Sequence, residues 1–337
     1  MIEQIKKNKS KNLNTLINTI FVIIIFAALF LIVYNNRDKI DEYKETLLNI
    51  SIVNIIIVLI FTISANIFRS WRWYYLLLPI KKPLSFGNVF KVTINALVAN
   101  FTMPGKLGVP VKALLLKKEE KVEMSKSLPS ILGEIFIEHS TEFIMATVCV
   151  LIGGHLAKLY RTISQIISNQ NALFNIGLFI SLIGLFVLAI LIFRKKIRSI
   201  DFFDKFLEAF KLSSSRIDYV SYSYLITLVN LIISYYIFWF LIKSLGHPEI
   251  DLTFIIFAGT ITNIMGLISP LPGGIGVREI TIYGLYDFYF GLGGIAFIAI
   301  IIMRIITYVS LFFCFLIEQL IAHVKASKKQ EKFMVSQ

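Results

Sequence analysis

The sequence predicts an all-α, polytopic integral membrane protein built from two inverted repeats, each with three transmembrane helices and one Pro-Gly-broken re-entrant hairpin. Three observations support this fold class. Apolar residues make up 56% of the 337 residues, only 16% are charged, and the mean hydropathy of +0.75 is too high for a soluble globular protein. Six apolar segments are long enough to cross a bilayer. Two Pro-Gly motifs recur at an offset of almost half the chain.

The six predicted spans follow from length and hydropathy. A helix rises about 1.5 Å per residue and the hydrocarbon core is about 30 Å thick, so a span needs roughly 20 apolar residues. The segments of that length are residues 15–34, 50–68, 128–152, 173–193, 222–244 and 294–322. The first has a basic leader and no small-residue cleavage site after it, which favours a retained signal anchor.

Two shorter apolar stretches, residues 86–103 and 253–269, each run into a Pro-Gly motif. We expect re-entrant hairpins near 86–120 and 253–290, because irregular backbone survives at membrane depth only where protein or a water-filled cavity surrounds it. Pairs of short crossings would fit the sequence equally. The motif that begins at Met103 shares Pro, Gly, Gly and Val with the one that begins 168 residues later. Each half contains three full crossings, an odd number, so the halves should be oppositely oriented.

The distribution of Lys and Arg predicts both termini in the cytoplasm, in a multi-pass protein of the cytoplasmic membrane. Of 34 such residues, 25 fall in the segments placed inside and 5 in those placed outside. The predicted organisation begins with a basic cytoplasmic tail (1–14) and a first repeat (15–152). An external linker (153–172), a second repeat (173–322) and a second basic tail (323–337) follow. The connection 194–221 should contain an amphipathic cytoplasmic helix, since Ile200, Phe203, Leu207 and Phe210 share one helical face.

Charge and cysteine content exclude several classes of function. The net charge of +13 comes from short Lys and Arg clusters between apolar runs, so it indicates membrane topology, and no nucleic-acid partner is expected. Both cysteines, Cys149 and Cys314, lie inside apolar runs and build neither a disulfide framework nor a thiolate metal site. His139 with Glu142 supplies too few ligands for zinc. We expect no metal and no cofactor.

The second hairpin carries a candidate phosphate site. Gly273, Gly274 and Gly276 permit unusual dihedrals, and the free N–H groups of the helix that follows favour an anion. Arg278 suits two-point binding of phosphate, and we expect Glu279 to hold that guanidinium or to exchange partners during transport. The structural alternative is a buried Arg278–Glu279 pair that only locks the hairpin.

The first hairpin offers Lys106 and Lys112, which we expect to assist lipid binding from the inner side. Their alternative role is ordinary anchoring at the positively charged inside face. Arg69-Ser-Trp-Arg-Trp73 follows the second span, where aromatic rings and arginines commonly anchor a helix at the membrane interface. The alternative is that this block captures a lipid head group.

Charged residues inside spans are costly and therefore point to function. Glu134, Glu138 and Glu142 recur every four residues and should line one face of a helix. Arg304 lies deep in the last span, and we expect one of these carboxylates to be its partner. Glu134, Glu138 and Arg304 then form a predicted polar path through the membrane. Such a pairing would serve helix packing, gating or proton coupling equally well.

Several motifs in this order resemble the lysylphosphatidylglycerol synthase transmembrane-region family of flippase-like membrane proteins. The resemblance covers roughly residues 15–322, and the block that begins at Pro272 is its most specific motif. The motifs are Arg69-Ser-Trp-Arg-Trp73, Asn100-Phe-Thr-Met-Pro-Gly-Lys-Leu-Gly108 with Lys112-Ala-Leu-Leu-Leu116, Leu132-Gly-Glu134, Arg304-Ile-Ile-Thr-Tyr308 and Pro272-Gly-Gly-Ile-Gly-Val-Arg-Glu279.

The resemblance implies a membrane module that binds and translocates an anionic or aminoacylated phospholipid or a polyprenyl-phosphate lipid. The alternative is a membrane subunit of a phosphatidylglycerol lysyltransferase-like enzyme. Such a subunit would lack the soluble catalytic domain and would work with a separate soluble partner. A third interpretation is a scaffold without transport. About 15 residues follow the last span, so we expect no lysyl transfer by this chain itself. The lipid, the direction of transport and the oligomeric state do not follow from the sequence.

Overall fold

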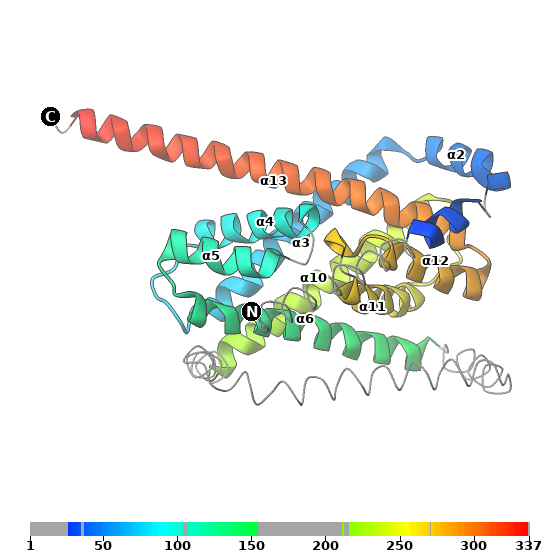
Figure 1. Ribbon diagram of the computed structural model, residues 1–337, viewed down its shortest axis with the longest axis horizontal. Helices are drawn as coiled ribbons and strands as arrows, with labels where there is room; N and C mark the ends of the chain where they lie inside the picture. Colours follow the sequence, from blue (N-terminus) through cyan, green and yellow to red (C-terminus); the bar gives the residue numbers. More distant parts are fainter. Residues whose placement is uncertain are drawn as a thin grey trace, which may run out of the picture.

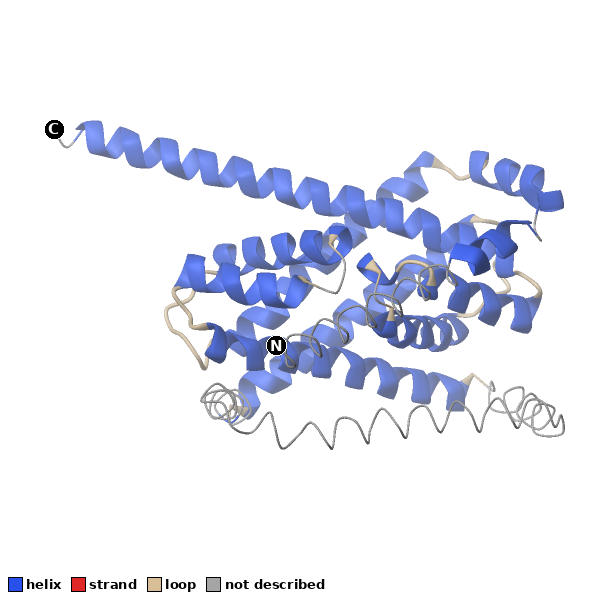
Figure 2. Cartoon of the chain, viewed as in Figure 1, coloured by secondary structure: helices blue, strands red, loops and turns tan. Residues whose placement is uncertain are grey.

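The computed structural model describes residues 26–34, 37–103, 107–153, 211, 216–269 and 271–335. In this part of the chain the regular elements are all helices, joined by short loops (Figure 2), and no strand occurs. The predicted all-α class is confirmed. The turn of the first hairpin at residues 104–106, the span 173–193 and the tail 1–14 lie outside the described residues. So do most of the external linker 153–172 and of the connection 194–221.

Four described helices are long and apolar enough to cross a membrane, and each covers a predicted span. They are α3 (Ile52–Leu77), α6 (Met124–Ile152), α10 (Ile217–Ser244) and the segment Gly293–Leu320 of α13 (Gly293–Val335). Of the predicted first span, only residues 26–34 are described, and these are helical. They are followed by η1 (Arg37–Lys39) and α2 (Ile40–Leu48). Helix α13 continues through most of the predicted tail 323–337.

Two pairs of shorter helices form the hairpins. The first pair is α4 (Phe86–Thr102) and α5 (Gly108–Glu120), and the second is α11 (Leu252–Ile268) and α12 (Val277–Phe290), separated by η3 (Pro272–Gly274). The longest of these four helices has 17 residues and spans about 26 Å, which is short of a bilayer core of about 30 Å. In Figure 1 the two hairpins lie at opposite sides of the view, between α6 and α13.

Corresponding elements of the two halves have corresponding packing partners. Helix α3 packs against α10. Helix α4 contacts α5 and α13, and in the same way α11 contacts α12 and α6. Helix α3 also packs on α6 and α13, as α10 does. The order of the elements and their contacts therefore repeat between the series α3–α6 and the series α10–α13.

The turn of the second hairpin depends on glycine. Gly273, Gly274 and Gly276 have φ angles of 59°, 74° and 82°, a region that residues with a Cβ rarely adopt. A Cβ at Gly273 would lie 2.7 Å from the Phe101 ring of α4, so the turn rests directly on the end of the first hairpin's opening helix. The unusual dihedrals predicted for these glycines are confirmed.

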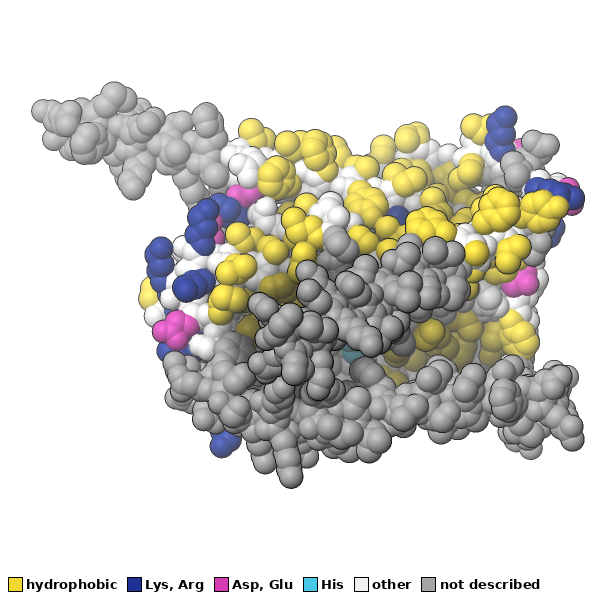
Figure 3. Space-filling model, in the orientation of Figure 1, with side chains coloured by type: hydrophobic (Ala, Val, Ile, Leu, Met, Phe, Trp, Pro, Cys, Tyr) yellow, Lys and Arg dark blue, Asp and Glu magenta, His cyan; other side chains and the backbone are white. Residues whose placement is uncertain are grey.

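Large apolar side chains cover the outer surface as well as the core. Phe136 and Ile152 of α6 are 69% and 77% exposed, and Phe312 of α13 is 58% exposed. Figure 3 shows hydrophobic side chains across the visible face, with Lys and Arg gathered toward its two ends. An apolar exterior of this extent is suited to lipid rather than water. The chain is a membrane protein with its charged residues at the ends and at the centre.

The close approach of α4 and α5 generates the first testable prediction. A Cβ at Gly108 would lie 2.8 Å from both Ala96 O and Asn100 Cβ, closer than real Cβ contacts allow. We expect Gly108→Ala to separate the two helices and to destabilise the protein by about 1–3 kcal/mol. Thermal unfolding in detergent measures this loss. Gly133→Ala is the matched control, because a Cβ at Gly133 meets nothing within 4 Å; equal melting temperatures for the two variants would contradict the prediction.

Candidate functional site

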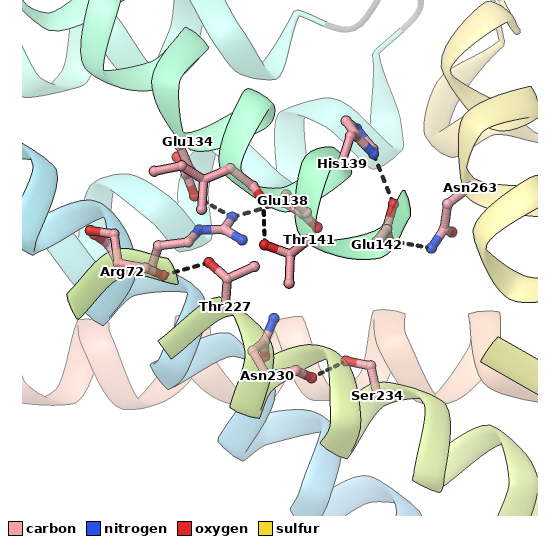
Figure 4. A network of polar contacts seen from close by, with 12 residues as sticks. Arg72, Glu134, Glu138, His139, Thr141, Glu142, Thr227, Asn230, Ser234 and Asn263 are labelled. Atoms are coloured by element: carbon pink, nitrogen blue, oxygen red, sulfur yellow. Dashed lines mark hydrogen bonds and ion pairs between the residues drawn. The ribbon is translucent and has the colours of Figure 1, made fainter. Parts of the chain in front are cut away.

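A buried arginine joins the carboxylates of α6. Arg72 of α3 donates its Nη2 to Glu134 Oε1 at 2.7 Å and to Glu138 Oε2 at 2.8 Å (Figure 4). Arg72 is 1% exposed and Glu134 4%. The four-residue spacing of the carboxylates places them on one face of α6, as predicted, and that face meets α3. Ions buried to this extent are stable only when they are paired, so this contact fixes α3 against α6.

Lys112 of α5 extends this ion-pair chain. Its Nζ pairs with Glu134 Oε2, and it lies 3.9 Å from the centroid of the Trp73 ring. The carboxylate and the aromatic face together compensate for removing an ammonium group from water. The Trp73 indole in turn donates to Ser130 Oγ at 3.1 Å. Lys112, predicted to assist lipid binding, is therefore already engaged by Glu134, while Lys106 lies outside the described residues.

Two predicted pairings are wrong. Arg304 pairs with Glu279 of α12 and with no described carboxylate of α6, because α12 and α13 are adjacent in the fold and α3 already supplies the partner of the α6 carboxylates. Glu279 also accepts the Gly276 N–H at 2.6 Å. Its carboxylate is thus directed to the hairpin turn and to α13, and the expected Arg278–Glu279 pair does not form.

The interpretation of Arg69-Ser-Trp-Arg-Trp73 as an interfacial anchor is also wrong for its last two residues. Arg72 and Trp73 are 1% and 0% exposed, and only Trp71, at 44%, has the exposure of an anchor. Hydropathy placed the end of the second span at residue 68, but α3 continues to Leu77. The spacing of Arg69, Arg72 and Trp73 at i, i+3 and i+4 puts them on one helix face, a signal that would have indicated burial.

A second polar group surrounds Glu142. Its Oε2 lies 2.8 Å from His139 Nδ1, and its Oε1 accepts from Asn263 Nδ2 at 2.8 Å (Figure 4). The same Oε1 accepts from Tyr235 Oη at 3.4 Å. Glu142 is 1% exposed. Helices α6, α10 and α11 therefore meet at one carboxylate. Among the described residues, no three His, Cys, Asp or Glu side chains are grouped closely enough to hold a metal.

Two adjoining cavities, each of about 260 Å³, lie beside these groups. The α5-side cavity is lined by Lys112 and Glu134 and by the hairpin glycines Gly273 and Gly274. The α10-side cavity is lined by Asn230 and Arg304, with the Glu142 group. The residues on the wall common to both are Arg69, Phe101, Glu138, His139 and Arg278.

Two arginines on the common wall lack a directly paired carboxylate in the described part of the chain. Arg69 and Arg278 form no ion pair with any described residue. Arg278 Nε, Arg304 Nη1 and Nη2, and the side-chain amide of Asn230 are buried without a hydrogen-bond partner in the described part of the chain. Each unsatisfied buried donor costs about 1–3 kcal/mol. A ligand with several oxygen acceptors would satisfy these groups together.

Glycines create the space for Arg278. A Cβ at Gly266 of α11 would overlap the Arg278 side chain at Nε, and one at Gly274 would lie 3.2 Å from the same atom. The amides of the turn are mostly occupied: Gly274 N–H donates to Leu271 O at 3.1 Å, and Gly276 N–H donates to Glu279. Arg278 Nε adds a side-chain donor, without a partner in the described part of the chain, to the N–H groups at the start of α12.

The charge balance of the site follows from these contacts. Among the described residues, the cations are Arg69, Arg72, Lys112, Arg278 and Arg304, and the carboxylates are Glu134, Glu138, Glu142 and Glu279. Five cations face four carboxylates, so with neutral His139 the site carries an excess of one positive charge. The arrangement is suited to binding an anion.

The bridging role of Arg72 generates a second prediction. Arg72→Met leaves Glu138 without a partner inside the protein, and we expect a loss of about 3–5 kcal/mol in unfolding free energy, measured by thermal or denaturant unfolding in detergent. Adding Glu138→Gln should restore part of that loss, because the uncompensated charge is removed. Arg216→Met serves as control, since Arg216 pairs with Asp218 on an exposed surface. An Arg72→Met protein as stable as this control would refute the bridge.

Comparison with known proteins supports one family. The family described as Lysylphosphatidylglycerol synthase TM region matches residues 17–314, which include every residue of the site. Searches of curated proteins and of solved structures found no match. The resemblance inferred from the motifs is confirmed, since the match covers most of the 337 residues. The chain belongs to the lysylphosphatidylglycerol synthase transmembrane-region family.

Proposed function

We propose that this protein binds the anionic head group of a membrane lipid between its two hairpins and moves that lipid across the cytoplasmic membrane. The observation that carries the proposal is the position of Arg69 and Arg278, on the wall common to both cavities and without a described counter-ion. A phosphate group offers two oxygens to each planar guanidinium, which is the geometry that arginine binds best.

Energetics favour a resident anion over an empty site. A charged group removed from water and left unpaired is strongly unfavourable, and charges inside membrane proteins face ligand or ion pathways for that reason. The unpartnered donors of Arg304 and Asn230 line the same α10-side cavity, so a bound phosphate or its polar substituent would satisfy them as well.

Cavity size indicates which part of the lipid enters. Each cavity holds about 260 Å³, slightly below the range of about 300–1,000 Å³ typical of pockets for whole small molecules. A head group fits within the two cavities together, while the acyl or polyprenyl chains remain in the bilayer. The substrate class is therefore a lipid with a phosphate in its head group, either a phospholipid, aminoacylated or not, or a polyprenyl phosphate.

The repeated packing supports an inverted repeat with re-entrant hairpins. Helices α4–α5 and α11–α12 are shorter than a typical span of about 20 residues, and the second turn rests on the end of α4 at Phe101. If the hairpins enter from opposite leaflets, the cavities on either side of this contact form a path between them. Glu134, Glu138 and Arg304 would line that path, with Arg72 between the first two. The distribution of Lys and Arg supports cytoplasmic termini.

The third prediction tests the transport activity. We expect the full chain in proteoliposomes to accelerate leaflet exchange of labelled phosphatidylglycerol, aminoacylated phosphatidylglycerol or polyprenyl phosphate. Arg278→Ala should reduce the rate at least about tenfold, because losing a hydrogen bond to a charged group costs about 1.5–3 kcal/mol. Arg216→Ala, which removes an exposed arginine outside both cavities, should exchange lipid like the unaltered protein.

Two results would contradict this function. Equal rates of lipid exchange by Arg278→Ala and Arg216→Ala would show that the phosphate does not bind at the common wall. Absence of exchange for every lipid, with binding retained, would favour the alternative of a membrane subunit that presents its lipid to a separate soluble enzyme.

A further inference from the structure

His139 lies where the proposed head group would pass. It lines both cavities, and its Nδ1 contacts Glu142 Oε2 at 2.8 Å. Histidine is the side chain whose ordinary pKa lies between about pH 5 and 8. Among the described residues that line the two cavities, His139 is the only histidine, and the other ionisable groups are Arg, Lys, Glu and Tyr.

The contact with Glu142 fixes which ring nitrogen can change its role. A carboxylate only accepts hydrogen bonds, so Nδ1 must carry a hydrogen in the neutral ring. Nε2 is then an acceptor, and it forms no hydrogen bond with any described residue. Protonation would place a hydrogen on Nε2. It would convert an acceptor on the common wall into a charged donor suited to a phosphate oxygen.

The surrounding charges make protonation depend on the ligand. Facing His139 from its own helix are Glu138 and Glu142, and the elements packed around α6 contribute a larger set. These are Arg69 and Arg72 from α3, Lys112 from α5, Tyr224 and Tyr235 from α10, and, across the cavities, Arg278 from α12 and Arg304 from α13, while α11 contributes the uncharged Asn263.

The excess of one positive charge in the empty site becomes two when His139 is protonated. The carboxylates of Glu142, which contacts Nδ1 at 2.8 Å, and of Glu138 favour that proton, and the surrounding arginines oppose it. An anion held by Arg69 and Arg278 offsets the arginines and favours the proton further. Binding of the anion and binding of the proton therefore strengthen each other. By linkage, each must raise the affinity for the other by the same factor.

We propose that the lipid phosphate and one proton enter the site together, the proton binding His139 Nε2, so that lipid movement is coupled to proton movement. The inference rests on the proposed function. The proton comes from water on the side where the phosphate enters and returns to water on the side where the phosphate leaves. A singly charged phosphodiester and a proton cross without net charge, so a difference in pH across the membrane drives the lipid while the membrane potential does not oppose it.

The fourth prediction is a proton count. Titration calorimetry of the full chain in detergent, with dihexanoyl-phosphatidylglycerol as the probe and with buffers of different ionisation enthalpy, gives the protons taken up per probe bound. The probe's phosphodiester stays ionised between about pH 5 and 8, so uptake reports the protein. We expect up to one proton per probe, and a Kd that rises up to about tenfold per pH unit as His139 loses its proton.

Two histidine variants provide the comparison. His139→Gln keeps an N–H for Glu142 but cannot bind a proton, so its uptake should be zero and its Kd independent of pH. His247→Gln is the matched control, because His247 also pairs with a glutamate, Glu249, at 2.8 Å but lies outside both cavities. It should behave like the unaltered protein, and thermal unfolding checks that each variant is folded.

The outcomes separate the two proposals. Binding without proton uptake by the unaltered protein overturns the coupling and leaves the lipid site in place. Unchanged uptake in His139→Gln overturns the assignment to His139. Absence of probe binding at every pH overturns the lipid site itself, and the coupling with it.

Discussion

The architecture of the site depends on one buried guanidinium. Arg72 bridges Glu134 and Glu138, and Lys112 reaches the remaining oxygen of Glu134, so α3, α5 and α6 are joined by a continuous chain of ion pairs. Inside a membrane protein, the polar groups of such a chain have no water to replace a lost partner. Arg69 stands one helical turn before Arg72, and His139 directly follows Glu138. The ion-pair chain thus sets the position of the wall that both cavities share.

A second, smaller bridge performs the equivalent task in the other half. Glu279 receives Arg304 on one oxygen and the Gly276 N–H on the other, which couples the hairpin turn to α13. The Glu142 group ties α6 to α10 and α11 in the same region. Each of the four carboxylates is thereby engaged, whereas Arg69 and Arg278 have no described counter-ion. The proposed anion binding therefore uses the arginines that the internal pairs leave over and does not need a dedicated phosphate-binding motif.

Sequence reasoning located the helices and the glycine turn because both depend on local properties. The apolar length of residues 128–152 and 222–244 predicts helices whatever they pack against, and the glycines at 273, 274 and 276 predict dihedrals that only the backbone must satisfy. The inward face of α6 followed from its four-residue spacing. Partner choice did not follow, because pairing depends on which helices become neighbours. Arg304 was assigned to α6, although its neighbour is α12, and the buried length of α3 beyond residue 68 exceeds what hydropathy indicates.

The glycines beside Arg278 set a size limit that is independent of charge. The Arg278 side chain passes over Gly266 and Gly274, at positions where a Cβ would overlap it or press against it. A residue even one methyl group larger at position 266 would displace the arginine without removing any ionisable group from the site. Under the proposed function, relatives that differ at this position would hold the arginine differently and accept head groups of different bulk. The proposed substrate range can therefore diverge through the smallest side chains of the site, while its set of charged residues stays the same.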